Sequence, residues 1–153
     1  MKKRILITIE YDGAQFVGWQ RQDNGVSVQA TLETAAKAFI GKITPVVGAG
    51  RTDSGVHATG QAAHLDVPEK FSANRVMQAL NAHLSDKPVT VRSALDVPIT
   101  LHARFSATRR HYLYRILPRL EKPALDIRRV WHHRQPLDSE RMHQAAQILV
   151  GQH

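Results

Sequence analysis

The sequence predicts an α+β protein built on a ferredoxin-like split βαβ unit, in which an antiparallel sheet carries its helices on one face. Four apolar, β-branched segments and two segments of helical periodicity follow one another in the order β-α-β-β-α-β. The chain has 153 residues, of which 42% are hydrophobic, and this suffices for one core. We therefore expect residues 1–153 to form a single domain, with the second face of the sheet left free.

The elements of this unit follow in order along the chain. Residues 4–10 are typical of a first strand, and a Gly-rich loop that carries Tyr11, Phe16 and Trp19 comes next. Ser27 is a suitable N-cap for a helix that ends at Gly41. The remaining elements are strands at 43–50, 60–67 and 88–95 and a helix that begins at Ser72.

An extra strand and a C-terminal helix are expected after the split βαβ unit. Residues 109–117 alternate, so that Arg109 and Leu113 would face one side and Tyr112 and Tyr114 the other. The helix is expected to run from Asp138 to Gly151, with Leu137 and Met142 as a hydrophobic staple. Its buried stripe would consist of Ala145, Ala146 and Leu149.

Composition excludes several classes of protein. The absence of cysteine excludes disulfides, thiolate nucleophiles and cysteine-ligated metal sites. No apolar run approaches the roughly 18 residues of a membrane span, and the basic amino terminus is not followed by a signal-peptide core, so we expect a cytoplasmic protein. His57 and His64 flank a strand start, and His132 and His133 would point to opposite faces, so no metal site is expected.

The positive charge is concentrated in one stretch of the chain. The formal net charge is +8, and residues 101–134 hold nine basic and two acidic residues. The basic residues of this stretch are mostly Arg and are interleaved with Tyr, Phe and His. A solvated basic face would explain this pattern, but it is more typical of a protein that binds nucleic acid.

The Gly-rich loop at 48–58 is the best candidate for chemistry. Three glycines surround Arg51 and Asp53 between two strands, and glycine lets a ligand approach the backbone closely. No GK[ST] sequence or helix follows, so this is not a phosphate-binding loop. The structural alternative is a turn in which Asp53 caps backbone amides and pairs with Arg51. Tyr112 and Tyr114 are either packing aromatics or a platform for a nucleobase.

Several stretches together resemble the tRNA pseudouridine synthase A (TruA) family over the whole chain. The sequence GRTDSGVH within the loop and the segment HARFSA further on are the most specific of these stretches. The full set of stretches that carry the resemblance is YDGAQFVGWQRQ at 11–22, SVQ at 27–29, GAGRTDSGVHATGQAAH at 48–64, LHARFSA at 101–107, RHYLYRI at 110–116 and LDSERMHQAAQILVGQH at 137–153. Ser54, where Ala is common, and Leu101, where Phe is common, are departures from the pattern.

The resemblance implies an isomerase that converts uridine to pseudouridine in the anticodon stem-loop of tRNA, after flipping the base out, with no cofactor and no metal. It implies that Asp53 is the catalytic nucleophile and that Tyr112 contacts the base. The RNA-binding residues would be Arg51, which assists base flipping, and Leu101, His102, Ala103, Arg104, Phe105 and Arg110. Family members are longer and have two related halves, so we expect this chain to be the amino-terminal half of a homodimeric enzyme.

One alternative from another class stays open. A ferredoxin-like sheet with a basic segment is also the architecture of non-catalytic RNA-binding modules. Such a module would have no use for a carboxylate near the phosphodiester backbone, so the loop at 48–58 distinguishes the two hypotheses.

Overall fold

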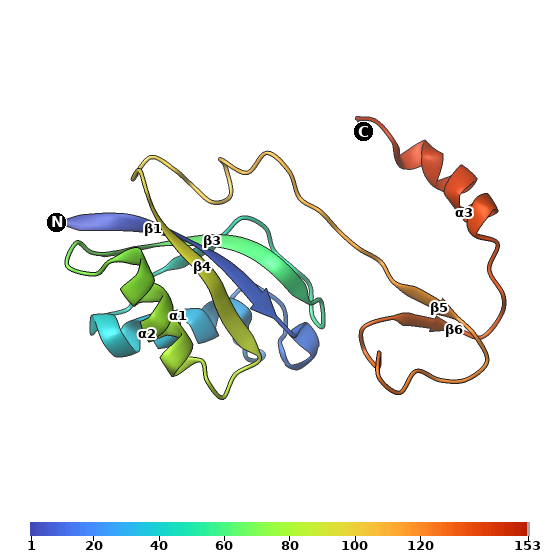
Figure 1. Ribbon diagram of the computed structural model, residues 1–153, viewed down its shortest axis with the longest axis horizontal. Helices are drawn as coiled ribbons and strands as arrows, with labels where there is room; N and C mark the ends of the chain where they lie inside the picture. The colour runs from blue at the N-terminus through green and yellow to red at the C-terminus, as the bar shows by residue number, and fades with distance from the viewer. Residues whose placement is uncertain (153) are drawn as a thin grey trace. The chain divides into compact units, whose positions relative to one another are not determined.

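The computed structural model describes residues 1–152, which fall into two units, Met1–His111 and the described residues from Tyr112 onward (Figure 1). The first unit holds a four-stranded sheet and two helices. The second holds a pair of short strands and the last helix. Among the described residues, no helix is long and apolar enough to span a membrane.

The sheet of the first unit is antiparallel throughout. Its strands lie in the order β2-β3-β1-β4, and the central strand β1 places Ile7 opposite Ala63 on one side and Ala94 on the other. This order and the succession of helices and strands confirm the predicted split βαβ unit. The strands are β1 (Lys2–Tyr11), β2 (Val46–Gly48), β3 (Ala58–Pro68) and β4 (Val89–Val97).

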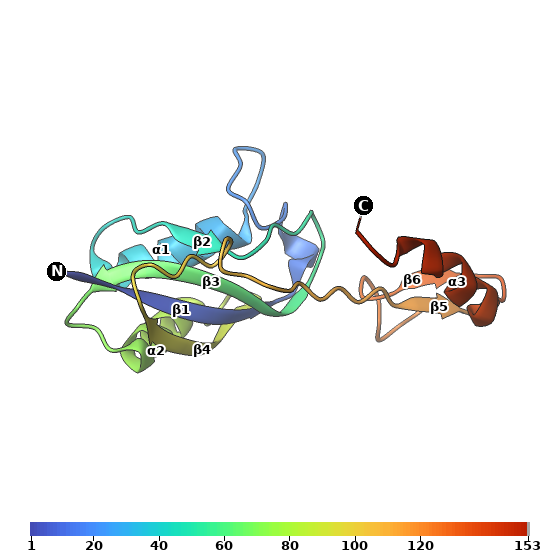
Figure 2. The ribbon, with the colours of Figure 1, turned by 90° about the horizontal axis from the view of Figure 1, so that it is seen from above.

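Two helices, α1 (Val28–Ile40) and α2 (Ala73–His83), cover one face of this sheet (Figures 1 and 2). The hydroxyl of Ser27 accepts a hydrogen bond from the amide of Ala30 at 3.1 Å, and Gly41 ends α1 with a φ of 84°. The hydroxyl of Ser72 caps α2 in the same way. The predicted ends of α1 and the predicted start of α2 are therefore confirmed.

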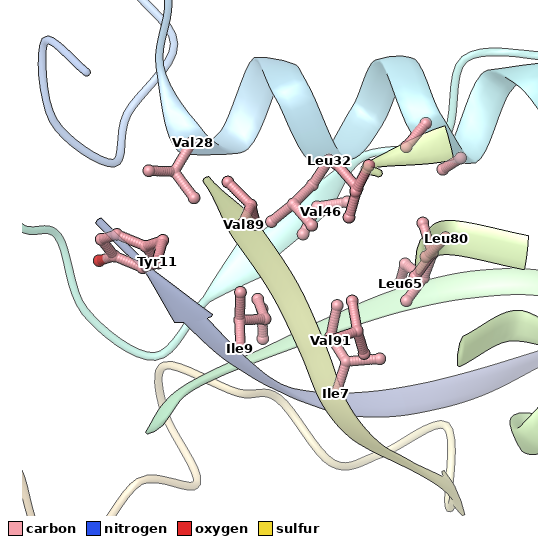
Figure 3. Close-up of a cluster of buried hydrophobic side chains, with 14 of the residues drawn as sticks. Ile7, Ile9, Tyr11, Val28, Leu32, Val46, Leu65, Leu80, Val89 and Val91 are labelled. Carbon is pink, nitrogen blue, oxygen red and sulfur yellow. The ribbon is translucent and has the colours of Figure 1, made fainter. Parts of the chain in front are cut away.

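The hydrophobic core lies between the sheet and the two helices. Alternate residues of β1, Ile5, Ile7 and Ile9, have no exposed surface, because successive side chains of a strand point to opposite faces. Figure 3 shows Ile7 and Ile9 beside Val91 of β4, with Leu32 of α1 close by. Each such residue contributes about 1.5–3 kcal/mol by burial, so this layer holds the first unit together.

The second face of the sheet is not free, contrary to the prediction. The chain that follows β4 turns back across it (Figure 1), and we call residues 99–106 the crossing segment. The guanidinium of Arg4 in β1 donates to the carbonyl oxygens of Ile99 and Leu101, each at 2.8 Å. The sequence pattern predicts which strand residues face away from the helices, but not which loop lies over them.

The expected strand at 109–117 is wrong over most of its length. Only β5 (Ile116–Pro118) is a strand, and it pairs in parallel with β6 (Trp131–His133). Residues 109–115 alternate in polarity but pair with no strand in the part of the chain that the structure describes. Alternation predicts a strand only where a neighbour supplies the hydrogen bonds.

The last helix, α3 (Ser139–Ala146), begins as predicted, because the carboxylate of Asp138 accepts hydrogen bonds from the amides of Glu140 and Arg141. A short 3₁₀ turn, η2 (Gln147–Leu149), continues it. The predicted burial of its apolar stripe is wrong. Ala145, Ala146 and Leu149 are exposed, since nothing in the described part of the second unit covers that face.

Candidate functional site

The loop between β2 and β3 places Asp53 at an exposed position. We call residues 49–57 the aspartate loop. It begins where the amide of Ala49 donates to the carbonyl of Ala62 at 2.7 Å, and it closes on a turn in which the amide of Val56 donates to the carbonyl of Asp53 at 3.2 Å. Arg51 is exposed as well. The loop thus connects the edge strand β2 to its neighbour β3.

The carboxylate of Asp53 is left available for a ligand. Within residues 1–152 it accepts no hydrogen bond and pairs with no cation, Arg51 included. The turn in which Asp53 caps amides and pairs with Arg51, the structural alternative drawn from the sequence, is therefore not formed in the described chain. A carboxylate held at a fixed place without a structural partner can act as a nucleophile or as a general base.

A second loop is joined to the aspartate loop by hydrogen bonds. We call residues 12–19 the support loop; it contains the 3₁₀ turn η1 (Gly13–Gln15). The amide of Trp19 donates to the carbonyl of Thr52 at 2.9 Å, and the hydroxyl of Ser54 donates to the carbonyl of Phe16 at 3.2 Å. The hydroxyls of Tyr11 and Thr52 lie 2.8 Å apart. These bonds fix the backbone on both sides of Asp53.

Two glycines of the support loop allow this close approach. A Cβ added to Gly13 would lie 1.9 Å from the carbonyl oxygen of Val56, and one added to Gly18 would lie 2.6 Å from that of Thr52. Gly18 also has a φ of 114°, which favours glycine. The sequence predicts this stretch as a loop and as part of the family resemblance, but not as the support of a site. Its glycines and buried aromatic residues were the available signal that it supports a site.

The crossing segment is fixed to the sheet by an ion pair. Arg4 donates to both carboxylate oxygens of Asp66 in β3, at 2.7 and 2.9 Å, while its third nitrogen binds the carbonyls of Ile99 and Leu101. The hydrogen bonds from Arg4 hold the pKa of Asp66 below its usual value. One planar guanidinium therefore joins two strands to the segment above them.

His64 is the second anchor of the crossing segment. Its side chain is buried on the face of the sheet opposite the helices, and its Nδ1 accepts a hydrogen bond from the amide of Ala103 at 3.1 Å. Burial, together with the positive charge of Arg4, lowers the pKa of His64 to about 4. The imidazole is therefore neutral at pH 7, as an acceptor at Nδ1 must be.

These anchors determine which predicted RNA-binding residues face outward. Ala103 is buried against the sheet, Leu101 and His102 are half-buried, and Arg104 and Phe105 are exposed. The anchors Arg4 and His64 were not predicted as site residues, because no local pattern shows that they contact a segment so far along the chain. Their contacts exist only in the folded sheet.

Arg110 joins the crossing segment to the aspartate loop. Its Nη2 donates to the carbonyl oxygen of Ala49 at 2.7 Å and to that of Arg104 at 3.2 Å, and its Nε also reaches Ala49 at 3.2 Å. Its side chain passes Gly50, where an added Cβ would lie 3.5 Å from Nε. A residue predicted to bind RNA thus makes its described contacts within the protein.

Tyr112, the predicted base-contacting residue, begins the second unit. Its side chain is 68% exposed and that of Tyr114 is 89% exposed. Neither ring packs into a core, so the interpretation of both as ordinary packing aromatics is wrong for the described chain. Exposed aromatic rings of this kind remain available to a ligand.

The chain belongs to the tRNA pseudouridine synthase family, a class of isomerases, because the profile of that family matches residues 7–106. Its relatives are named tRNA pseudouridine synthase A. The relative from Rhodopseudomonas palustris is 55% identical over 150 residues, which are 98% of this chain and 60% of the relative. Those from Rhodospirillum rubrum and Maricaulis maris are 53% and 55% identical, with 98% of this chain matching 54% and 60% of them. The chain thus spans less than two thirds of the length of these relatives.

Proposed function

We propose that this chain supplies the aspartate loop and part of the RNA-binding surface of an enzyme that isomerises uridine to pseudouridine in the anticodon stem-loop of tRNA. The observation that carries the proposal is the exposed carboxylate of Asp53, which has no partner in the described chain and stands on a loop held by hydrogen bonds to residues 11–19. Family membership supports the same reaction.

The chemistry requires a carboxylate at a fixed position. In the isomerisation the N1–C1′ bond of uridine breaks, the uracil turns over, and a C5–C1′ bond forms; C5 loses a proton and N1 ends with one. Oxidation state does not change. The carboxylate of Asp53 either attacks C1′ or takes a ribose proton after the uracil leaves, and both routes need it ionised and fixed. Tyr112 stacks on the base and assists removal of the C5 proton.

The RNA must bring one nucleotide out of its stem before this chemistry starts. Flipping a base costs a few kcal/mol, and Arg51, on the same exposed loop as Asp53, supplies a cation beside the vacated position. Arg104 on the crossing segment binds backbone phosphate. The complete enzyme is a cytoplasmic homodimer in this proposal.

The test is tritium release from tRNA labelled at C5 of uridine, measured in the full-length protein that contains this chain. Asp53→Asn keeps the shape of the side chain but removes its charge, so we expect turnover to disappear while tRNA affinity changes by less than about threefold. Asp23→Asn, at another exposed loop position, is the matched control and should keep wild-type turnover.

The alternative, a non-catalytic RNA-binding module, predicts another result. It requires tRNA binding without tritium release by the wild-type protein. Turnover of Asp53→Asn within tenfold of wild type would instead overturn the assignment of the nucleophile and leave the reaction itself standing.

A further inference from the structure

Three aromatic rings in contact with one another lead from the sheet to the surface, and the outer two, His102 and Phe105, are stacked. His64, buried on β3, contacts the ring of His102 edge-on, with centroids 4.9 Å apart and planes at 67°. His102 stacks on Phe105 with centroids 4.4 Å apart and planes at 28°. Phe105 is 79% exposed, so the outermost ring of the stack is open to a further planar group.

The outer part of this stack is rigid. Nδ1 of His102 lies 3.3 Å from the amide of Arg104 and 3.4 Å from that of Phe105, which both donate to it. The amide of His102 donates to the hydroxyl of Ser106, and the amide of Ser106 donates to the carbonyl of His102 at 2.8 Å. The turn that carries Phe105 is therefore closed on itself and fixed to the sheet by its two anchors. A ligand that binds here finds the ring already in place.

A single exposed apolar side chain is common on protein surfaces and needs no function. Phe105 differs because it is supported from beneath by another ring and because the guanidinium of Arg104 lies over it, 5.9 Å from the ring centroid. Residues 101–111 contain Arg104, Arg109 and Arg110 and no acidic residue. This charge favours a polyanion, and an aromatic face beside it favours a base.

We propose that Phe105 is a stacking platform for an unpaired nucleobase of the RNA, distinct from the uridine that reacts at Asp53. The base adds a third ring to the stack of His102 and Phe105, on the ring face over which the guanidinium of Arg104 lies, and this guanidinium moves to the phosphate next to the base. Stacking is tolerant of base identity, since every base has a π face, so the platform recognises an unpaired nucleotide rather than a sequence. This inference rests on the proposed function only in taking RNA as the ligand.

The test measures binding of the 153-residue chain to an unpaired RNA loop that carries 2-aminopurine, whose fluorescence is quenched on stacking. Phe105→Leu keeps an apolar side chain without a π face, and we expect it to weaken binding about tenfold and to abolish the protein-dependent quenching. Phe105→Trp should retain both. Ile43→Ala, at an apolar residue with 65% exposure after α1, is the matched control.

The outcomes distinguish an unpaired nucleobase from a second copy of the chain as the group that contacts Phe105. Fully paired RNA of the same sequence should bind wild type and Phe105→Leu equally, within about twofold. The proposal is overturned if Phe105→Leu binds and quenches like wild type. It is also overturned if the variant changes only the sedimentation of the chain, because Phe105 would then contact a second copy. If the wild-type full-length protein releases no tritium while the 153-residue chain still quenches 2-aminopurine, the proposed function is overturned and the stacking platform is not.

Discussion

The guanidinium of Arg110 donates two hydrogen bonds to one carbonyl oxygen, that of Ala49, at 2.7 and 3.2 Å. A third bond, to the carbonyl of Arg104, joins the crossing segment to the first residue of the aspartate loop. The fork geometry of Arg suits this bridge, whereas an ammonium carries the same charge without the fork. The contact links the segment predicted to bind RNA to the start of the loop that carries Asp53.

Replacing Arg110 tests whether it acts through its shape or through its charge. We expect Arg110→Lys to lose about as much turnover as Arg110→Ala, roughly tenfold, because neither restores the bridge to Ala49. Affinity for tRNA should fall less in Arg110→Lys than in Arg110→Ala, since the charge remains. Measuring kcat and the dissociation constant separately in the full-length protein checks this. Full rescue of turnover by Lys would mean that the residue works as a phosphate-binding charge.

Binding of tRNA should weaken steeply with salt, because residues 101–134 carry nine basic and two acidic residues. Arg104→Ala should reduce the log–log slope of affinity against salt by about one unit, the loss of one phosphate contact. Arg75→Ala, at an exposed Arg on α2, removes the same charge from the opposite side of the sheet and should leave the slope unchanged. A flat salt profile for the wild type would show that the basic stretch is only a solvated face.

The stability of the chain should depend on the protonation of His64. Its pKa in the folded state, about 4, lies below the value of 6.5 in an unfolded chain, so the unfolded state binds more protons between these pH values. The contribution is complete above pH 6.5 and decreases as the pH falls toward 4, by up to about 3 kcal/mol. Urea unfolding at pH 7 and pH 4.5, followed by circular dichroism, measures it.

His64→Asn is the control for this pH dependence. Its amide oxygen can accept from the amide of Ala103 but does not titrate, so the variant should lose less stability than wild type between pH 7 and pH 4.5. The carboxylate of Asp66 loses its stabilising charge only at lower pH, since its pKa is held below the usual range. Equal losses in the two proteins would assign the acid sensitivity to other groups.

Gly13→Ala should disturb the aspartate loop. The added methyl group would lie 1.9 Å from the carbonyl oxygen of Val56, a backbone atom that cannot move alone, so we expect a destabilisation of about 1–3 kcal/mol. Gly60→Ala in β3 is the matched control, because its nearest neighbour, the methyl of Thr8, is 3.9 Å away. Thermal unfolding of both variants compares them. Equal midpoints would show that the two loops are not tightly joined.

Local signals in the sequence were sufficient for the elements of the first unit. Ser27 and Gly41 bound α1 because capping depends on residues within one helical turn. The exposed position of Asp53 could likewise be anticipated from the glycines around it. The anchors Arg4 and His64 could not, because their partners at 99–103 lie far along the chain and are brought to them only by the fold.

Two of the wrong expectations have a common physical cause. The alternation at 109–115 identifies residues that could form a strand, and the apolar stripe at Ala145, Ala146 and Leu149 identifies a helix face that could be buried. Neither pattern identifies the partner that the strand or the helix face requires. Periodicity shows which side chains share a face, but a strand also needs a neighbour and a stripe needs a surface to cover it. Neither is supplied within the described residues, so these patterns did not give the predicted structure.

The bond between the amide of Trp19 and the carbonyl of Thr52 has a consequence for the order of folding. The support loop follows β1, while the aspartate loop is bounded by β2 and β3, so the two loops meet only after these strands have paired. Contacts between distant segments form late, since the closure of the intervening chain is costly. On the ribosome, the backbone around Asp53 therefore cannot acquire its final shape before β3 has emerged.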